Sequence, residues 1–143
     1  MEFNNAIQVL PWLYLCGEKQ IESVINKVDV WIDFRNELST NLEIKIPNNI
    51  VTIKLPFIDG DLEKAKKIYP MTKLILNQIK SSNQKALISC HRGASRSALM
   101  ALWCMAEEMG YQKAYDKMKM INPELNIDVH FMPIIEQIKR MCK

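Results

Sequence analysis

A cysteine and an arginine that enclose a five-residue loop, Cys90 and Arg96, are the most chemically informative pair in the sequence. The loop lies between a predicted strand and a predicted helix, so several of its backbone N–H groups point to one spot, where the helix dipole adds positive potential. Cys90 ends the strand, and the same N–H groups would lower the pKa of its thiol and make the sulfur nucleophilic near neutral pH. Arg96 can hold two oxygens of a tetrahedral dianion through its planar guanidinium. The spacing therefore predicts an anion-binding pocket with a nucleophile at its floor.

The remaining residues of the loop fit the same role. Gly93 lets the backbone fold tightly around a ligand, and Ser97 can place a hydroxyl next to the sulfur. We expect the anion to be bound along the loop, at His91, Arg92, Gly93, Ala94, Ser95 and Arg96. The side chains of His91 and Arg92 face the rim, where they are either solvated or form a basic border that favours polyanionic substrates.

The segments that must position this loop alternate between strand and helix patterns. Strands are predicted at residues 7–9, 13–15, 28–34, 50–55 and 86–89, the last of them central and parallel. Helices are predicted at about residues 18–26, 69–81, 96–109, 111–121 and 128–141. The second helix is expected to begin near Tyr69 because a helix tolerates Pro70 only close to its start, and Leu74 is expected to face the core. The patterns indicate one α/β domain, residues 1–143, with a central, mostly parallel sheet flanked by helices.

Length and composition restrict the class of protein. The chain has 143 residues, enough for one hydrophobic core, and its 48% of hydrophobic residues excludes a disordered chain. A formal net charge of +3 does not suggest a general nucleic-acid binder, although it leaves room for a local basic pocket. The sequence leaves the oligomeric state unknown.

The sequence favours a cytoplasmic protein without a metal. Its first residues lack the basic start and the long apolar stretch of a signal peptide, and no window reaches the ~20 apolar residues of a membrane span. The four cysteines form no Cys-x-x-Cys pair, and with only two histidines they favour free thiols over a zinc site. We therefore expect reduced thiols, no membrane partner and no cofactor.

Residues 90–97, Cys-His-Arg-Gly-Ala-Ser-Arg-Ser, resemble the signature loop Cys-x-x-Gly-x-x-Arg-Ser/Thr of the cysteine-dependent protein phosphatases, and in particular of their small dual-specificity branch. The resemblance covers nearly the whole chain. Residues 7–17 (IQVLPWLYLCG) are similar to the opening strand pair of that branch, residues 28–37 (VDVWIDFRNE) to its following strand, and residues 55–61 (LPFIDGD) to the segment that carries its general acid. The resemblance implies the three-layer sandwich of these phosphatases and a single phosphatase catalytic domain.

The resemblance also implies a two-step hydrolysis of phosphomonoesters. Cys90 attacks phosphorus to form a phosphocysteine, an acid protonates the leaving oxygen, and water then releases phosphate. Arg96 and the loop amides hold the equatorial oxygens, and Ser97 eases departure of the sulfur in the second step. Asp59 follows Leu-Pro-Phe-Ile in the register where the family carries its acid; Asp61 is the alternative, unless it caps the next helix. The implied substrate is a phosphorylated protein, through phosphotyrosine and also phosphoserine or phosphothreonine.

One departure from the family pattern leaves alternatives open. The family usually has a histidine immediately before the cysteine, whereas this chain has Ser89, which makes fewer and shorter-reaching hydrogen bonds. A phosphatase-like module that binds phosphate with little turnover is one alternative. A phosphatase for RNA 5′-phosphate ends or phosphoinositides is another, favoured by a basic rim; apart from such ends, nucleic acid is not an expected partner.

Overall fold

The computed structural model describes residues 7–36 and 45–143. Within these ranges the chain forms, in order, β1 (Ile7–Leu10), β2 (Leu13–Gly17), η1 (Glu18–Gln20), α1 (Ile21–Val24), η2 (Ile25–Lys27), β3 (Val30–Asp33), β4 (Val51–Lys54), α2 (Leu62–Ser81), β5 (Ala86–Cys90), α3 (Arg96–Met109), α4 (Tyr111–Ile121), η3 (Val129–Phe131) and α5 (Met132–Met141). The elements labelled η are short 3₁₀ helices. Every strand and helix predicted from the sequence has a counterpart here.

The described strands form one sheet in the order β1-β2-β5-β3-β4, in which all neighbours are parallel except β1 and β2. β5 is the central strand and all five of its residues are buried, which is typical of a parallel strand covered on both faces. Gly17 pairs with Cys90 and Asp33 with Ser89, so the carboxyl ends of three neighbouring strands meet at one edge. Ligands bind at this edge in open α/β sheets.

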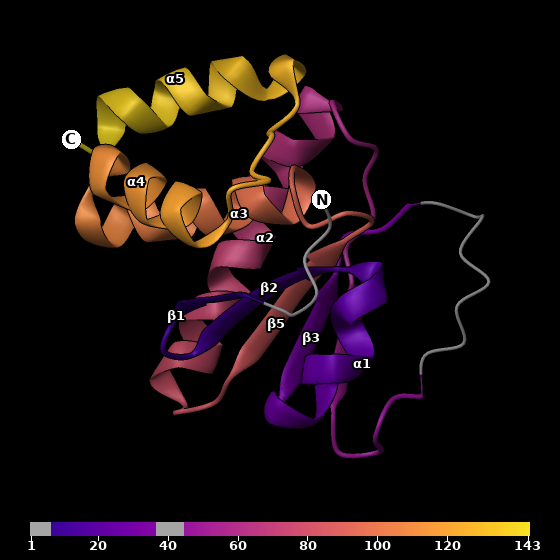
Figure 1. Cartoon of the computed structure of the whole chain (residues 1–143). Coiled ribbons are helices and arrows are strands. Elements are labelled where there is room, and N and C mark those ends of the chain that lie inside the picture. Colours follow the sequence, from indigo (N-terminus) through magenta and orange to yellow (C-terminus); the bar gives the residue numbers. More distant parts are fainter. Residues whose placement is uncertain (1–6, 37–44) are drawn as a thin grey trace.

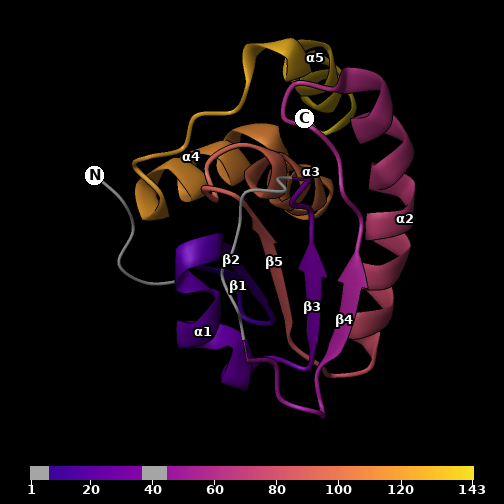
Figure 2. The same cartoon turned by 90° about the vertical axis from the view of Figure 1, so that its right-hand side faces the viewer.

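Helices cover both faces of the sheet (Figure 1). Ile21 and Val24 of α1 pack with Trp31 of β3 in a small core on one face, and a larger core fills the other face beneath α2 and α3. Figure 2 shows α1 and α2 on opposite sides of the strands, with α3, α4 and α5 gathered at the end toward which the strand arrows point. The predicted α/β sandwich with a central, mostly parallel sheet is confirmed.

The helix that follows the anion-binding loop is almost completely buried. Residues 96–106 of α3 are all buried, and the helix ends at Gly110, whose φ of +88° favours glycine. Its boundaries are those predicted from the sequence. No helix in the described ranges is both long and apolar enough to cross a bilayer.

The predicted start of the second helix, near Tyr69, is wrong. α2 begins at Leu62, and Pro70 lies inside it rather than near its first turn. Asp61 caps the helix by accepting the N–H of Lys64 at 3.1 Å, which fixes the earlier start. Pro70 is exposed, so the helical carbonyl that it leaves without a donor lies on the solvent side. Leu74 does not face the core as expected: it is 73% exposed, because the buried face of α2 runs through other positions.

Candidate functional site

The loop that joins β5 to α3 is folded tightly against the end of β2. Gly93 has a φ of +80°, in the left-handed region where a side chain is strained. A Cβ atom at Gly93 would lie 2.7 Å from the backbone nitrogen of Gly17, and a Cβ atom at Gly17 would lie 2.6 Å from the carbonyl oxygen of Arg92. The two backbones approach so closely that neither glycine position has room for a side chain.

Cys90 lies at the floor of this loop, and its residue is only 2% exposed. The backbone N–H of Gly93 donates to its Sγ at 3.2 Å, and the Oγ of Ser97 lies 3.1 Å from the same sulfur. Donors aimed at a sulfur stabilise negative charge on it. The expected contact between Ser97 and the sulfur is therefore present.

Arg96 is the first residue of α3 and is 5% exposed. Its Nη1 donates to the carbonyl oxygen of Phe57 at 2.9 Å, which ties the start of α3 to the loop before α2. A buried guanidinium beside the amide N–H groups of a helix start favours an anion at that position.

The two candidate acids occupy different places. Asp59 contacts the anion-binding loop: Ser95 Oγ donates to Asp59 Oδ1 at 2.6 Å. Ser95 Oγ in turn accepts the backbone N–H of Asp128 at 2.9 Å, so the hydroxyl bridges Asp59 and the segment before α5. Asp61 instead caps α2 through the N–H of Lys64. Asp59 is thus the aspartate of this pair that lies against the loop.

The rim of the loop carries a cluster of charged side chains. His91 Nδ1 lies 3.0 Å from Oε1 of the buried Glu18, whose Oε2 lies 3.3 Å from Nη1 of Arg35. Arg35 donates to both carboxylate oxygens of the buried Asp33, each at 2.9 Å. Arg92 is exposed. Of the two predicted rim residues, His91 is therefore held by a carboxylate and Arg92 faces solvent.

A family model described as "Dual specificity phosphatase, catalytic domain" matches residues 13–141. The matched range includes the anion-binding loop, the loop that carries Asp59 and every element from β2 to α5. The chain belongs to the dual-specificity phosphatase family. This is the family that the signature loop implied.

The relatives agree with this membership. The chain is 31% identical over 134 residues to mouse "Dual specificity protein phosphatase 12"; the match covers 89% of this chain and 39% of that relative's length. Human DUSP28 has a similar structure, with a TM-score of 0.78 at 15% identity, covering 94% of this chain and 93% of that one. A human "tyrosine phosphatase-like serine/threonine/tyrosine-interacting protein" gives a TM-score of 0.77 at 19% identity, covering 97% and 98%. At these identities the structural likenesses show the fold.

Ser89, which stands where the family usually has a histidine, is fully buried and has a partner. Trp31 Nε1 donates to Ser89 Oγ at 2.8 Å. The backbone carbonyl of Ser89 accepts the N–H of Phe34 at 2.8 Å. A tryptophan on the neighbouring strand thus anchors the residue before the cysteine.

Two asparagines also support the loop and were missed by the sequence reasoning. The buried side chain of Asn122 lies with its Nδ2 3.5 Å from the carbonyl oxygen of Gly93, and the backbone N–H of Asn126 donates to the carbonyl oxygen of Ala94 at 3.0 Å. The sequence marks this region as a break between two helices. Its contact with a loop some thirty positions upstream has no local signal.

Two of the other cysteines, Cys16 and Cys104, are buried and suit packing. Burial raises the pKa of the Cys104 thiol to about 11, and burial together with the nearby Cys90 raises the pKa of Cys16 well above its ordinary value. Among the described residues, no group of three or more His, Cys, Asp or Glu side chains is arranged to hold a metal ion.

Proposed function

We propose that this protein hydrolyses phosphomonoesters through a phosphocysteine at Cys90, and that its substrates are proteins phosphorylated on tyrosine and on serine or threonine. The observation that carries the proposal is the pair of polar contacts at the sulfur, from the Gly93 N–H and the Ser97 hydroxyl, in a loop of the dual-specificity family. Residues 1–143 act as the catalytic domain.

In the first step the sulfur of Cys90 forms a bond to phosphorus while the bond from phosphorus to the ester oxygen breaks. Asp59 gives its proton to the departing oxygen. Arg96 and the amides of residues 91–96 hold the three equatorial oxygens as their charge develops. The Phe57 carbonyl supports this geometry because it links Arg96 to the loop that carries Asp59.

In the second step water attacks phosphorus and the bond from sulfur to phosphorus breaks. Asp59, now a carboxylate, accepts the proton of the water. The hydroxyl of Ser97, 3.1 Å from the sulfur, donates a hydrogen bond to the departing thiolate of Cys90. The products are inorganic phosphate and the free enzyme, so no cofactor enters the balance.

The test is the hydrolysis of p-nitrophenyl phosphate and of phosphopeptides by the wild type and two matched variants. Cys90→Ser should lower kcat by at least about a thousandfold, as removal of a nucleophile does in other enzymes. Cys104→Ser makes the same substitution at a buried cysteine in α3, away from the anion-binding loop, and should retain activity. Equal activity of the two variants would refute the assignment of Cys90. Turnover of phosphotyrosine, phosphoserine and phosphothreonine peptides of one sequence defines the substrate class.

A second candidate function is phosphate-dependent binding with little turnover, and Ser89 is the observation that favours it. Serine is shorter than histidine and forms fewer hydrogen bonds, so it can fix the backbone around Cys90 less firmly. The hydroxyl of Ser89 nevertheless accepts a hydrogen bond from Trp31. Binding of a phosphopeptide without measurable hydrolysis of it by the wild type would support this candidate over the first.

A further inference from the structure

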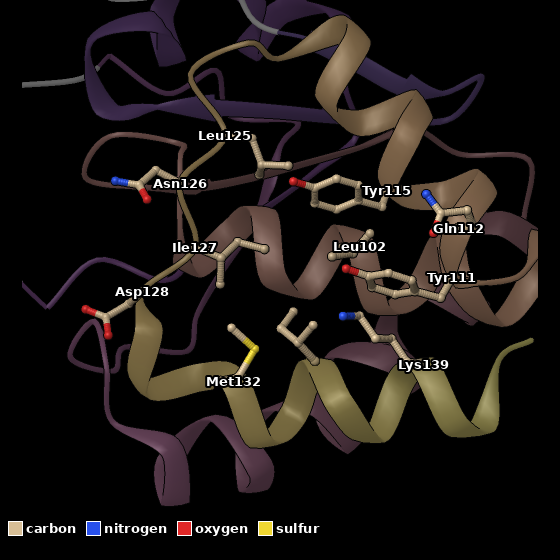
Figure 3. A pocket seen from close by; sticks show the side chains of 11 residues that line it. Leu102, Tyr111, Gln112, Tyr115, Leu125, Asn126, Ile127, Asp128, Met132 and Lys139 are labelled. Atoms are coloured by element: carbon tan, nitrogen blue, oxygen red, sulfur yellow. The ribbon is translucent and has the colours of Figure 1, made fainter.

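A cavity lies outside the anion-binding loop, between α4, α5 and the segment that joins them (Figure 3). Its volume is about 480 Å³, within the range of pockets that bind small organic molecules. None of residues 90–97 lines it. The proposed phosphatase reaction therefore leaves this cavity unexplained.

The walls of the cavity combine apolar and aromatic side chains with polar ones. Leu125 and Ile127 come from the joining segment and Met132 from the first turn of α5. The rings of Tyr111 and Tyr115 lie 5.8 Å apart at an angle of 20° along α4. Met132 is 46% exposed, so an apolar surface is open to a ligand from solvent.

The two ends of the cavity differ in charge. Of the described residues that line it, Lys139 is the one with a basic side chain, and its Nζ lies 5.4 Å from the centre of the Tyr111 ring. Figure 3 shows Lys139, Tyr111 and Gln112 together at one end and Asp128 at the other. The positive end of the α4 dipole reinforces the Lys139 end, because Tyr111 and Gln112 are the first residues of that helix.

Two carboxylates near the cavity, Glu136 and Asp128, have partners of their own. Glu136 Oε1 lies 3.6 Å from Lys139 Nζ in an exposed pair of adjacent helical turns, which is a weak interaction. The Asp128 carboxylate is occupied by the backbone N–H and the ring Nδ1 of His130, at 2.8 and 2.7 Å, and these contacts lower its pKa. Burial raises the pKa of Tyr111, and Tyr115 and the carboxylates of Glu136 and Asp116 raise it further, so its hydroxyl stays protonated near neutral pH and can donate a hydrogen bond to an anion.

We propose that this cavity binds a small amphiphilic anion. The single acidic group lies at the Lys139 and Tyr111 end, and the aliphatic or aromatic body packs on Met132, Ile127 and Leu125. The complementarity of charge at one end and of apolar surface along the rest favours this class over a cation or a fully polar ligand.

A ligand in the cavity would contact a segment that is hydrogen-bonded to the anion-binding loop. The joining segment is a wall of the cavity, and its backbone donates to the loop at two points, from Asn126 to Ala94 and from Asp128 to Ser95. Because a ligand that binds the native state slows local opening, it should slow amide exchange in this segment.

The experiment uses decanoate as the probe, with decyltrimethylammonium as the cation of equal chain length, and measures binding by calorimetry and hydrogen exchange. It is done with the Cys90→Ser variant in saturating vanadate, so that the anion-binding loop is filled. A failure of the proposed phosphatase reaction therefore does not affect the result. Decanoate should bind at one saturable site and slow exchange in residues 125–132, and the cation should do neither.

Two pairs of variants locate the site. Met132→Trp should fill the cavity and abolish saturable binding, whereas Met120→Trp, at an 82% exposed methionine of α4, should not. Lys139→Gln should lower the affinity for decanoate by about two- to fivefold, as expected for the loss of an exposed charge contact. Lys117→Gln on α4 should leave that affinity unchanged. Thermal unfolding of each variant checks that it is folded. Absence of saturable binding, equal binding of the cation, or full binding by Met132→Trp would overturn the proposal.

Discussion

A nucleophilic sulfur needs hydrogen-bond donors that stabilise its negative charge and do not transfer a proton to it. Cys90 has two neighbours of this kind. One is a backbone amide and the other a serine hydroxyl. The proposed acid, Asp59, is bound by a different serine, Ser95, whose hydroxyl donates to its Oδ1. In the proposed reaction, separate groups therefore stabilise charge and transfer the proton.

Asp59→Asn should therefore impair hydrolysis according to the leaving group. For a phosphoserine peptide or phenyl phosphate, whose oxygen must be protonated as it departs, kcat should fall by about 10²- to 10⁴-fold. For p-nitrophenyl phosphate, whose phenolate leaves readily, the loss should be much smaller. Asp61→Asn is the control, because asparagine still caps α2 and activity should persist. An equal loss with both leaving groups would exclude Asp59 as the acid.

The pair of Trp31 and Ser89 should contribute to stability as a unit. Trp31→Phe removes the donor to a buried hydroxyl, which costs about 1–3 kcal/mol in the free energy of unfolding. Once Ser89→Ala has removed that hydroxyl, Trp31→Phe should cost clearly less. The measurement is a double-mutant cycle by urea unfolding. Additive effects of the two substitutions would show that the hydrogen bond is not energetically coupled.

At the scale of elements, the site depends on how β2, β5 and the start of α3 meet. Strand, loop and helix follow one another within residues 86–109, so local patterns were enough to predict them. The start of α2 was not predictable from Pro70 alone, because a capping aspartate and an exposed face allow a proline inside the helix. Contacts between distant strands, such as Gly17 against Arg92, depend on sheet register and have no local pattern.

Gly93→Ala tests this close approach. Alanine at a φ of +80° costs about 1–2 kcal/mol, and its Cβ would also collide with the backbone of Gly17. We expect loss of both thermal stability and phosphatase activity. Gly110→Ala imposes a similar φ at the end of α3, away from the site, and should lower the melting temperature while leaving kcat/KM nearly intact. Normal activity of Gly93→Ala would contradict the described loop.

On the scale of the whole molecule, two cores on opposite faces hold the sheet, and its carboxyl edge carries Cys90 and the anion-binding loop. The sequence was sufficient for the fold class and for the strand, loop and helix that hold Cys90 and Arg96, since these follow from local spacing. It was not sufficient for the support around the loop, where Trp31, Glu18 and Asn122 contribute from distant segments. The cavity between α4 and α5 likewise exists only once those helices pack.

The global fold should also determine which thiols react. Because burial raises the pKa of Cys104 to about 11 and that of Cys16 further, almost none of either is thiolate near neutral pH. Iodoacetamide should therefore modify Cys90 in the native protein, vanadate should protect it, and Cys16 and Cys104 should react only in urea or at strongly alkaline pH. Peptide mass spectrometry measures the pattern. Modification of Cys104 before Cys90 would contradict it.

The most direct test of the central claim is to look for the phosphorylated cysteine itself. A reaction with p-nitrophenyl phosphate is quenched in acid within the first turnover, and the protein is digested and analysed by mass spectrometry. The account predicts one added phosphoryl group on the peptide that contains Cys90, absent from the Cys90→Ser variant. Turnover at full rate with no phosphate on that sulfur at any time would contradict it.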